Sequence, residues 1–207
     1  MDADMLFRIP ALLIALTIHE YSHARAAVAL GDPTPRFMGR LTLNPIPHLD
    51  PIGLLMLWLF KFGWAKPVEI NPNNFHNYRQ GMLYVSLAGP LSNVVLAFFT
   101  YMVGEVLAHM GLLSDFWFKM LLMLYIYNLI LAVFNMIPIP PLDGSKILAS
   151  LFPAFEGRVY GFLERYGFII LLALVYLGFI GQFMDPTIER LDKIIRTIIK
   201  SILGTIF

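Results

Sequence analysis

Two histidines and a glutamate stand within one helical turn of a mostly apolar stretch, LTIHEYSHARAAVAL at residues 16–30. Because residues four apart lie on one face of a helix, His19 and His23 can direct both imidazoles at a single metal ion. Glu20 lies on the adjacent face, where its carboxylate can reach a metal-bound water without being a ligand itself. This H-E-x-x-H spacing is typical of zinc hydrolases in which the glutamate is the general base.

The alternative to a metal site is a chance pattern whose side chains are satisfied inside a helix bundle. Ionisable side chains within an apolar segment cost several kcal/mol unless each of them has a partner. A metal ion is an efficient partner for the two imidazoles. The surroundings of the motif therefore favour a metal site.

A third ligand must come from elsewhere, because catalytic zinc usually has three protein ligands and an open position for water. The chain has no cysteine, which leaves His, Asp and Glu. Asp143 is the favoured candidate, because it follows an apolar segment within NMIPIPPLDGSKIL, where prolines break the helix. Broken backbone at membrane depth occurs where it is buried in protein or lines a wet cavity. The other candidates in or near the membrane are Glu105, His48, His109 and Asp50.

The composition of the chain indicates a membrane protein. Its 207 residues are 58% hydrophobic and 14% charged, whereas a soluble domain is about 45–50% apolar and about 25% charged. A net charge of +1 gives no long-range field, so we expect no nucleic-acid partner. The acidic start, MDADMLFRIP, is unlike a cleavable signal peptide, and the first apolar segment is expected to remain in the protein.

Four segments are long and apolar enough to cross a bilayer, which needs about 20 helical residues. They cover about 7–30, 81–110, 116–138 and 167–184. The sequence therefore predicts an all-α membrane protein, a polytopic bundle of about four transmembrane helices that must position the metal ligands.

Smaller elements are expected around these spans. The apolar stretch PIGLLMLWLF, residues 51–60, is too short to cross and predicts a re-entrant or half helix. Alternation of apolar and polar residues around Leu41 and Leu43 predicts a small β-hairpin after the first span.

The end of the chain has a different pattern from the spans. Asp185 as N-cap and Pro186 at the first helical position, followed by isoleucines at helical spacing with lysines and arginines between them, predict a C-terminal amphipathic helix. This helix would lie in the membrane interface, or pack on the protein or on a second copy in a homo-oligomer. Residues 1–184 then form an integral-membrane core and residues 185–207 the amphipathic helix.

Basic residues set orientation, because they are retained on the cytoplasmic side of a membrane. Both long connections, 31–80 and 139–165, carry several lysines and arginines, whereas the short turn at 111–115 carries none. With four spans the two basic connections lie on one side. The sequence thus predicts a multi-pass protein of the cell membrane with its active site toward the cytoplasmic side.

Three motifs occur in order along the chain: HEYSH (19–23), AGPLSN (88–93) and NMIPIPPLDG (135–144). Together they resemble the site-2 protease family of intramembrane zinc metalloproteases. The linker stretches GRLTLNPIPHLDPIG and GWAKPVEINPNNF are similar to its compact bacterial and archaeal branch, which has no PDZ domain. The resemblance covers roughly residues 8–150. It implies that His19, His23 and Asp143 bind one zinc ion per chain and that Glu20 activates the water.

Three further residues are implied less directly. The resemblance places Asn93 and Asn135 at the catalytic cavity, where they would hold the substrate backbone or the tetrahedral oxyanion. His48, in the proline-rich linker, is a candidate oxyanion donor at the cavity mouth. Each has a structural alternative: a hydrogen bond between helices for Asn93, a helix cap for Asn135 and a turn contact for His48.

The implied function is a zinc-dependent endopeptidase that hydrolyses peptide bonds within or near transmembrane segments, in regulated intramembrane proteolysis or in remnant clearance. Its partners would be a transmembrane protein or peptide substrate and the lipid bilayer. A non-catalytic zinc-binding membrane protein or a metal transporter is the alternative. A transporter needs further carboxylates and histidines along a path, and the chain has few of them. An inactive adaptor would not need Glu20.

Overall fold

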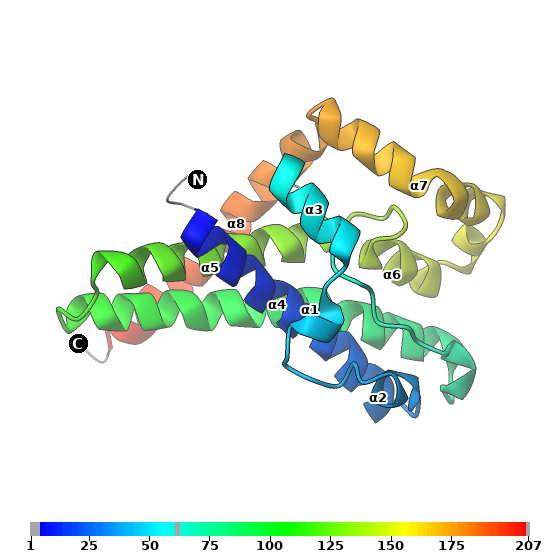
Figure 1. The fold of residues 1–207 in the computed structure, drawn as a ribbon, viewed down its shortest axis with the longest axis horizontal. Helices are drawn as coiled ribbons and strands as arrows, with labels where there is room; N and C mark the ends of the chain where they lie inside the picture. The colour runs from blue at the N-terminus through cyan, green and yellow to red at the C-terminus, as the bar shows by residue number, and fades with distance from the viewer. Residues whose placement is uncertain (1–4, 61–62, 206–207) are drawn as a thin grey trace.

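A computed structural model describes residues 5–60 and 63–205, and the regular structure in these residues is helical (Figure 1). The α-helices are α1 (Met5–Ala29), α2 (Thr34–Phe37), α3 (Pro51–Phe60), α4 (Tyr78–His109), α5 (Asp115–Asn135), α6 (Asp143–Leu151), α7 (Arg158–Tyr176) and α8 (Phe179–Leu203). Single turns of 3-10 helix lie at Ile46–His48, Pro72–Asn74 and Pro153–Glu156. The prediction of an all-α protein is confirmed.

Three of the described helices are long and apolar enough to cross a membrane. They are α4, α5 and the segment Val159–Tyr176 of α7. Helix α1 has 25 residues, but it is not among the three, because its arginines, glutamate and histidines lower its hydropathy. The spans predicted at 81–110 and 116–138 correspond to α4 and α5.

The fourth span, predicted at 167–184, is wrong in its bounds. Helix α7 ends at Tyr176, and α8 begins at Phe179. Between them Gly178 has φ 76°, a left-handed conformation that glycine adopts without steric penalty. The chain therefore turns inside the apolar stretch that the hydropathy pattern treats as one segment.

The C-terminal amphipathic helix is present, but it begins at Phe179 rather than after Asp185, so Pro186 lies inside it. Its buried residues Ile195 and Ile199 pack against Tyr125 and Leu129 of α5, with Ala97 of α4 and Leu203 in the same cluster. Of the arrangements expected for this helix, the structure shows packing on the protein itself.

The predicted β-hairpin around residues 40–45 is wrong, since no strand pair forms there in the described part of the chain. The N–H groups of Asn44 and Ile46 bond to the side chains of Thr42 and Asn44, which stabilises turns instead of a second strand. An isolated antiparallel bridge joins Leu49 to Ala65. Between these two residues the predicted short helix is confirmed as the ten-residue α3, and residues 61–62 of that region lie outside the described residues.

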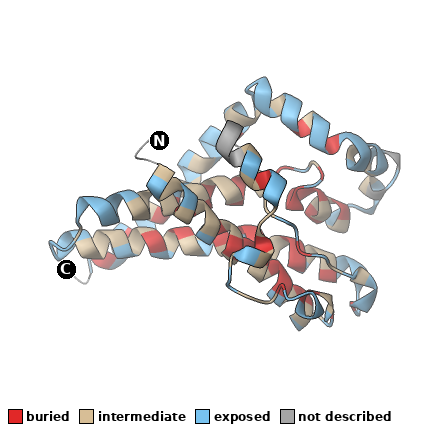
Figure 2. Cartoon of the chain, in the orientation of Figure 1, coloured by how far each residue is buried: buried red, intermediate tan, exposed pale blue. Residues whose placement is uncertain are grey.

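Helix α1 packs against both α4 and α5. Four alanines on it are fully buried, and small residues allow helix backbones to approach closely in membrane proteins. These are Ala11, Ala15, Ala24 and Ala27. Buried residues concentrate where α1, α4 and α6 meet, which is where the motif residues lie (Figure 2).

Candidate metal centre

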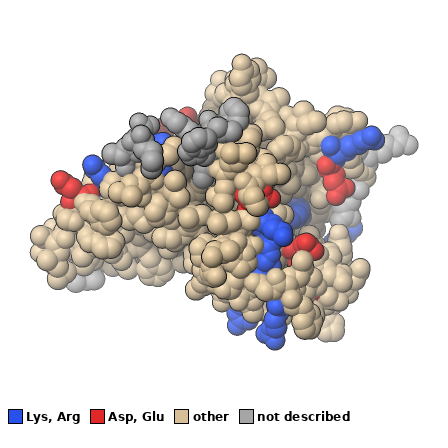
Figure 3. Space-filling view, viewed as in Figure 1, with Lys and Arg blue, Asp and Glu red and all other residues tan. Residues whose placement is uncertain are grey.

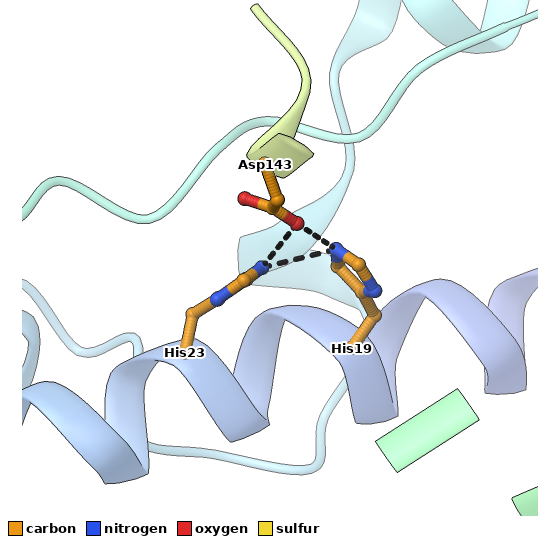
Figure 4. Close-up of side chains that lie close together, drawn as sticks. All are labelled: His19, His23 and Asp143. Carbon is orange, nitrogen blue, oxygen red and sulfur yellow. Dashed lines mark hydrogen bonds and ion pairs between the residues drawn. The ribbon is translucent and has the colours of Figure 1, made fainter. Parts of the chain in front are cut away.

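Three buried side chains from distant parts of the sequence meet at one point (Figure 4). His19 and His23 project from one side of α1, and Asp143, the first residue of α6, faces them. The Nε2 atoms of the two histidines lie 3.0 Å apart. Oδ2 of Asp143 lies 3.2 Å from Nε2 of His19 and 3.1 Å from Nε2 of His23.

The outer nitrogens of both imidazoles donate to oxygen acceptors. Nδ1–H of His19 donates to Oδ1 of Asn93 at 2.6 Å, and Nδ1–H of His23 donates to the carbonyl oxygen of Val85 at 2.7 Å. Because a carbonyl oxygen only accepts, each Nδ1 carries a proton, and Nε2 is the nitrogen that is left to bind a metal. This is the arrangement in which a histidine binds a metal through Nε2 while its other nitrogen is held by the protein.

The three converging atoms fit a zinc ion. Zinc binds nitrogen at about 2.0–2.1 Å and carboxylate oxygen at about 2.0–2.2 Å, so tetrahedral ligand atoms lie about 3.3 Å apart. The observed separations of 3.0, 3.1 and 3.2 Å are close to this value. Two imidazole nitrogens and one carboxylate oxygen at such distances, in a buried site, repel one another unless a proton or a metal ion lies among them.

The backbone of α4 passes directly against the two imidazoles at Gly89. A Cβ atom added there would lie 2.4 Å from Nε2 of His23 and 2.6 Å from Cε1 of His19. The AGPLSN motif therefore has glycine at this position because no side chain fits.

Asp143 reaches the histidines because α6 starts immediately after a tight turn. Leu142 is the N-cap of α6, so the Asp143 carboxylate lies in the first helical turn, where negative charge is favourable. A Cβ on Gly144 would lie 2.3 Å from the carbonyl oxygen of Met136. Asp143 thus supplies one candidate ligand. Gly144, the next residue, allows α6 to pack closely onto the turn that ends α5.

Comparison with known proteins agrees with this site. Residues 106–178, which include Asp143, match Peptidase family M50. The "Putative zinc metalloprotease YwhC" of Bacillus subtilis is 39% identical over 178 residues, covering 82% of this chain and 80% of YwhC. The chain belongs to peptidase family M50. The resemblance to site-2 proteases and the expectation of a metalloprotease are thereby confirmed.

Two further relatives have names that also describe them as putative zinc metalloproteases. The "Putative zinc metalloprotease Rip2" of Mycolicibacterium smegmatis is 30% identical over 79% of this chain and 64% of its own length. The "Putative zinc metalloprotease MJ0611" of Methanocaldococcus jannaschii is 44% identical over 70 residues, 31% of each chain. No solved structure gives a significant match.

Glu20, the expected base of this M50 protein, is buried next to the cluster on α1. Its Oε2 accepts a hydrogen bond from the backbone N–H of Val68 at 3.0 Å. The stretch between α3 and α4 therefore lies against the carboxylate that the motif assigns to proton transfer.

Asn93 is fully buried and lies beside the candidate metal ligands, but all its polar atoms bond to protein groups. Its Oδ1 accepts from His19, and its Nδ2 donates to the carbonyl of Ala15 at 3.1 Å and to Oδ1 of Asn128 at 2.8 Å. No amide hydrogen of Asn93 is left for a substrate oxyanion. The geometry gives Asn93 the role of orienting His19.

Asn128 was not among the residues singled out from the sequence. It is fully buried on α5 and holds the Asn93 amide in the orientation that accepts from His19. An asparagine in the middle of an apolar span was the signal that could have identified it.

Asn135 and His48 are not joined to the cluster by any described contact. Asn135 ends α5, where its Nδ2 donates to the carbonyl of Leu131 at 3.0 Å. His48 is buried in the linker, its Nε2–H donates to the carbonyl of Thr42 at 2.9 Å, and its Nδ1 has no partner among the described atoms. The bond of His48 agrees with its structural alternative, a turn contact, whereas Asn135 bonds within the last turn of its own helix, and the C-cap of α5 is Met136.

Proposed function

We propose that the chain is an intramembrane zinc-dependent endopeptidase that hydrolyses peptide bonds within or near transmembrane segments of other proteins. The observation that carries this proposal is the convergence of His19, His23 and Asp143 on one buried point beside α4 and α5. A ligand set of two imidazoles and one carboxylate leaves a position open for water and substrate.

His19, His23 and Asp143 would hold one zinc ion per chain, which, when bound, supplies Lewis-acid activation of a water and of the scissile carbonyl. Glu20 takes the proton of the attacking water on its carboxylate and then delivers it to the leaving amine. The protein walls around the cluster exclude bulk water, since the three ligands and Glu20 are all buried.

The position of the site supports the proposed substrate class. Helices α4 and α5 are long and apolar enough to span a membrane, and the cluster packs against them. A transmembrane helix has its peptide groups bonded within the helix, so a substrate segment must unwind locally before a scissile bond reaches Glu20.

We also propose a multi-pass arrangement in the cell membrane with the site toward the cytoplasmic side. Support comes from the basic connections, because 31–80 follows the segment that carries His19 and His23, and 139–165 contains Asp143. On the face shown in Figure 3, one group of charged side chains lies toward α2 and α7, and another lies where α4 ends and α5 begins.

The test compares purified wild type with Glu20→Gln, and with Glu164→Gln as a matched control on the exposed surface of α7. Zinc content and cleavage of a model transmembrane substrate are measured for each. We expect about one zinc in all three proteins and cleavage by wild type and Glu164→Gln alone. Equal cleavage by Glu20→Gln would reject Glu20 as the base, and zinc binding by all three without cleavage by any would reject the protease proposal for this substrate class.

A further inference from the structure

The segment between α3 and α4 crosses Glu20 as an extended strap, here defined as residues 65–71. Ala65 pairs with Leu49 in an isolated β-bridge, and the N–H of Lys66 donates to the carbonyl of His48 at 2.9 Å. Halfway along the strap, Val68 is buried and its N–H donates to Oε2 of Glu20 at 3.0 Å. The strap therefore donates a backbone hydrogen bond to one of the two carboxylate oxygens of Glu20, Oε2.

A buried arginine fixes the first half of the strap. The Arg40 side chain is 3% exposed, and its guanidinium donates to the carbonyl oxygens of Pro47, Lys66 and Pro67. Two of these carbonyls belong to the strap, immediately before Val68. Burying a guanidinium against carbonyl groups is unfavourable unless its donors are satisfied, so Arg40 holds these strap carbonyls strongly in place.

A buried aspartate fixes the other end. Asp32 is fully buried, and its carboxylate accepts from the N–H of Asn71 at 2.8 Å and from Nδ2 of Asn74 at 2.7 Å. It also accepts from the N–H and the hydroxyl of Thr34, at 3.1 and 2.6 Å. Because Asp32 follows α1 closely, it ties the end of the strap to the helix that carries Glu20.

We propose that Asp32 and Arg40 are positioning residues that hold the Val68 N–H against Oε2 of Glu20 and thereby orient the Glu20 carboxylate. This inference rests on the proposed role of Glu20 as proton acceptor. With Oε2 held by the strap, the second oxygen, Oε1, is left to exchange the proton with water and leaving amine. The strap thus orients the Glu20 carboxylate by a hydrogen bond, as Asn93 and the Val85 carbonyl orient the imidazoles of His19 and His23.

The donor itself is tested by replacing Val68. Val68→Pro removes the N–H, whereas Val68→Ala keeps it and serves as the matched control. We expect Val68→Pro to lower kcat about 10-fold or more, with KM and zinc content unchanged, and Val68→Ala to retain wild-type kcat. Equal kcat in both variants, or loss of zinc in proportion to loss of activity, would overturn the proposal.

The two anchors are tested by variants that remove their charge and by conservative ones. Asp32→Asn and Arg40→Gln should lower kcat about 10-fold at unchanged KM, and Arg40→Lys, which keeps a cationic donor, should restore part of it. If Arg40→Lys is no better than Arg40→Gln, or if KM rises while kcat is kept, the anchors act on substrate binding or folding and the positioning role is rejected.

A readout that needs no activity separates this inference from the proposed function. Hydrogen exchange is measured on the peptide that covers residues 64–75 in wild type, Glu20→Ala and Asp32→Asn. Faster exchange of the Val68 amide in both variants is expected whether or not the protein cleaves the test substrate. Unchanged exchange in Glu20→Ala would show that Glu20 does not hold the strap and would overturn the inference by itself.

Discussion

Nδ1 of His19 on α1 lies 2.6 Å from Oδ1 of Asn93 on α4, so a side chain of α4 fixes the orientation of this candidate metal ligand by a direct hydrogen bond. We therefore predict that Asn93→Ala weakens zinc affinity by about 10–100-fold, because the ring loses the acceptor that sets its tautomer. The measurement is zinc competition with a chelator of known affinity. Asn135→Ala, at the end of α5, is the control and should keep wild-type affinity; the same loss in both variants would contradict the assigned role.

Gly89 gives a steric prediction at the same site. A Cβ at this position would lie 2.4 Å from Nε2 of His23, so Gly89→Ala forces the imidazole away from the other two ligands. We expect zinc binding to be abolished and cleavage with it. Gly161→Ala on α7, where an added Cβ meets nothing within 4 Å, should retain zinc. Zinc binding by Gly89→Ala at wild-type affinity would mean that α4 lies farther from His23 than described.

The local parts of the site could be predicted from the sequence, because their geometry is set by one helix. The spacing of His19 and His23 places both rings on one face of α1 wherever that helix packs. The partner of each Nδ1 could not be predicted, since the carbonyl of Val85 and the amide of Asn93 are brought there only by packing of α4 on α1. Asn128 could have been singled out as a polar residue in an apolar span, but its bond to Asn93 also depends on how α4 and α5 pack.

The errors in the fold have a similar origin. Alternation around Leu41 and Leu43 predicted a hairpin, but a buried arginine and local side-chain bonds take the backbone groups that a strand pair needs. The hydropathy pattern joined the end of α7 to the start of α8 in one predicted span, because a single glycine hardly changes the mean hydropathy of the segment. The left-handed conformation of Gly178, which ends α7, is not visible in that mean. Alternation and hydropathy describe which residues are apolar. They do not describe where a side chain takes the hydrogen bond that a backbone group would otherwise make.

Asp32 makes stability depend on pH in a defined direction. Burial raises the pKa of its carboxyl, but hydrogen bonds from Thr34, Asn74 and Asn71 outweigh this effect and hold the pKa below its ordinary value. A folded-state pKa below the unfolded one stabilises the protein fully above about pH 4, the unfolded pKa. This stabilisation is lost as pH falls through the folded pKa.

Asp32→Asn should therefore lower the free energy of unfolding by about 1–3 kcal/mol at pH 7. The difference from wild type should shrink when the pH is lowered below about 4, since wild type loses its own contribution there. Thermal unfolding in detergent at several pH values measures this difference. A gap between the two proteins that stays constant down to pH about 3 would contradict the ionised, hydrogen-bonded carboxylate.

Helix α8 packs on α4 and α5, the helices that position the site. Ile199 is fully buried against α4 and α5, whereas its neighbour Ile198 is 45% exposed. Ile199→Ala should destabilise the protein by about 2–5 kcal/mol, because it leaves a cavity in that contact, and Ile198→Ala should have a much smaller effect. The unfolding midpoint in detergent, measured for both variants, decides this. Equal midpoints would mean that α8 leaves α4 and α5 in solution, and the helix would then be free to lie in the membrane interface, as its isoleucines and basic residues also permit.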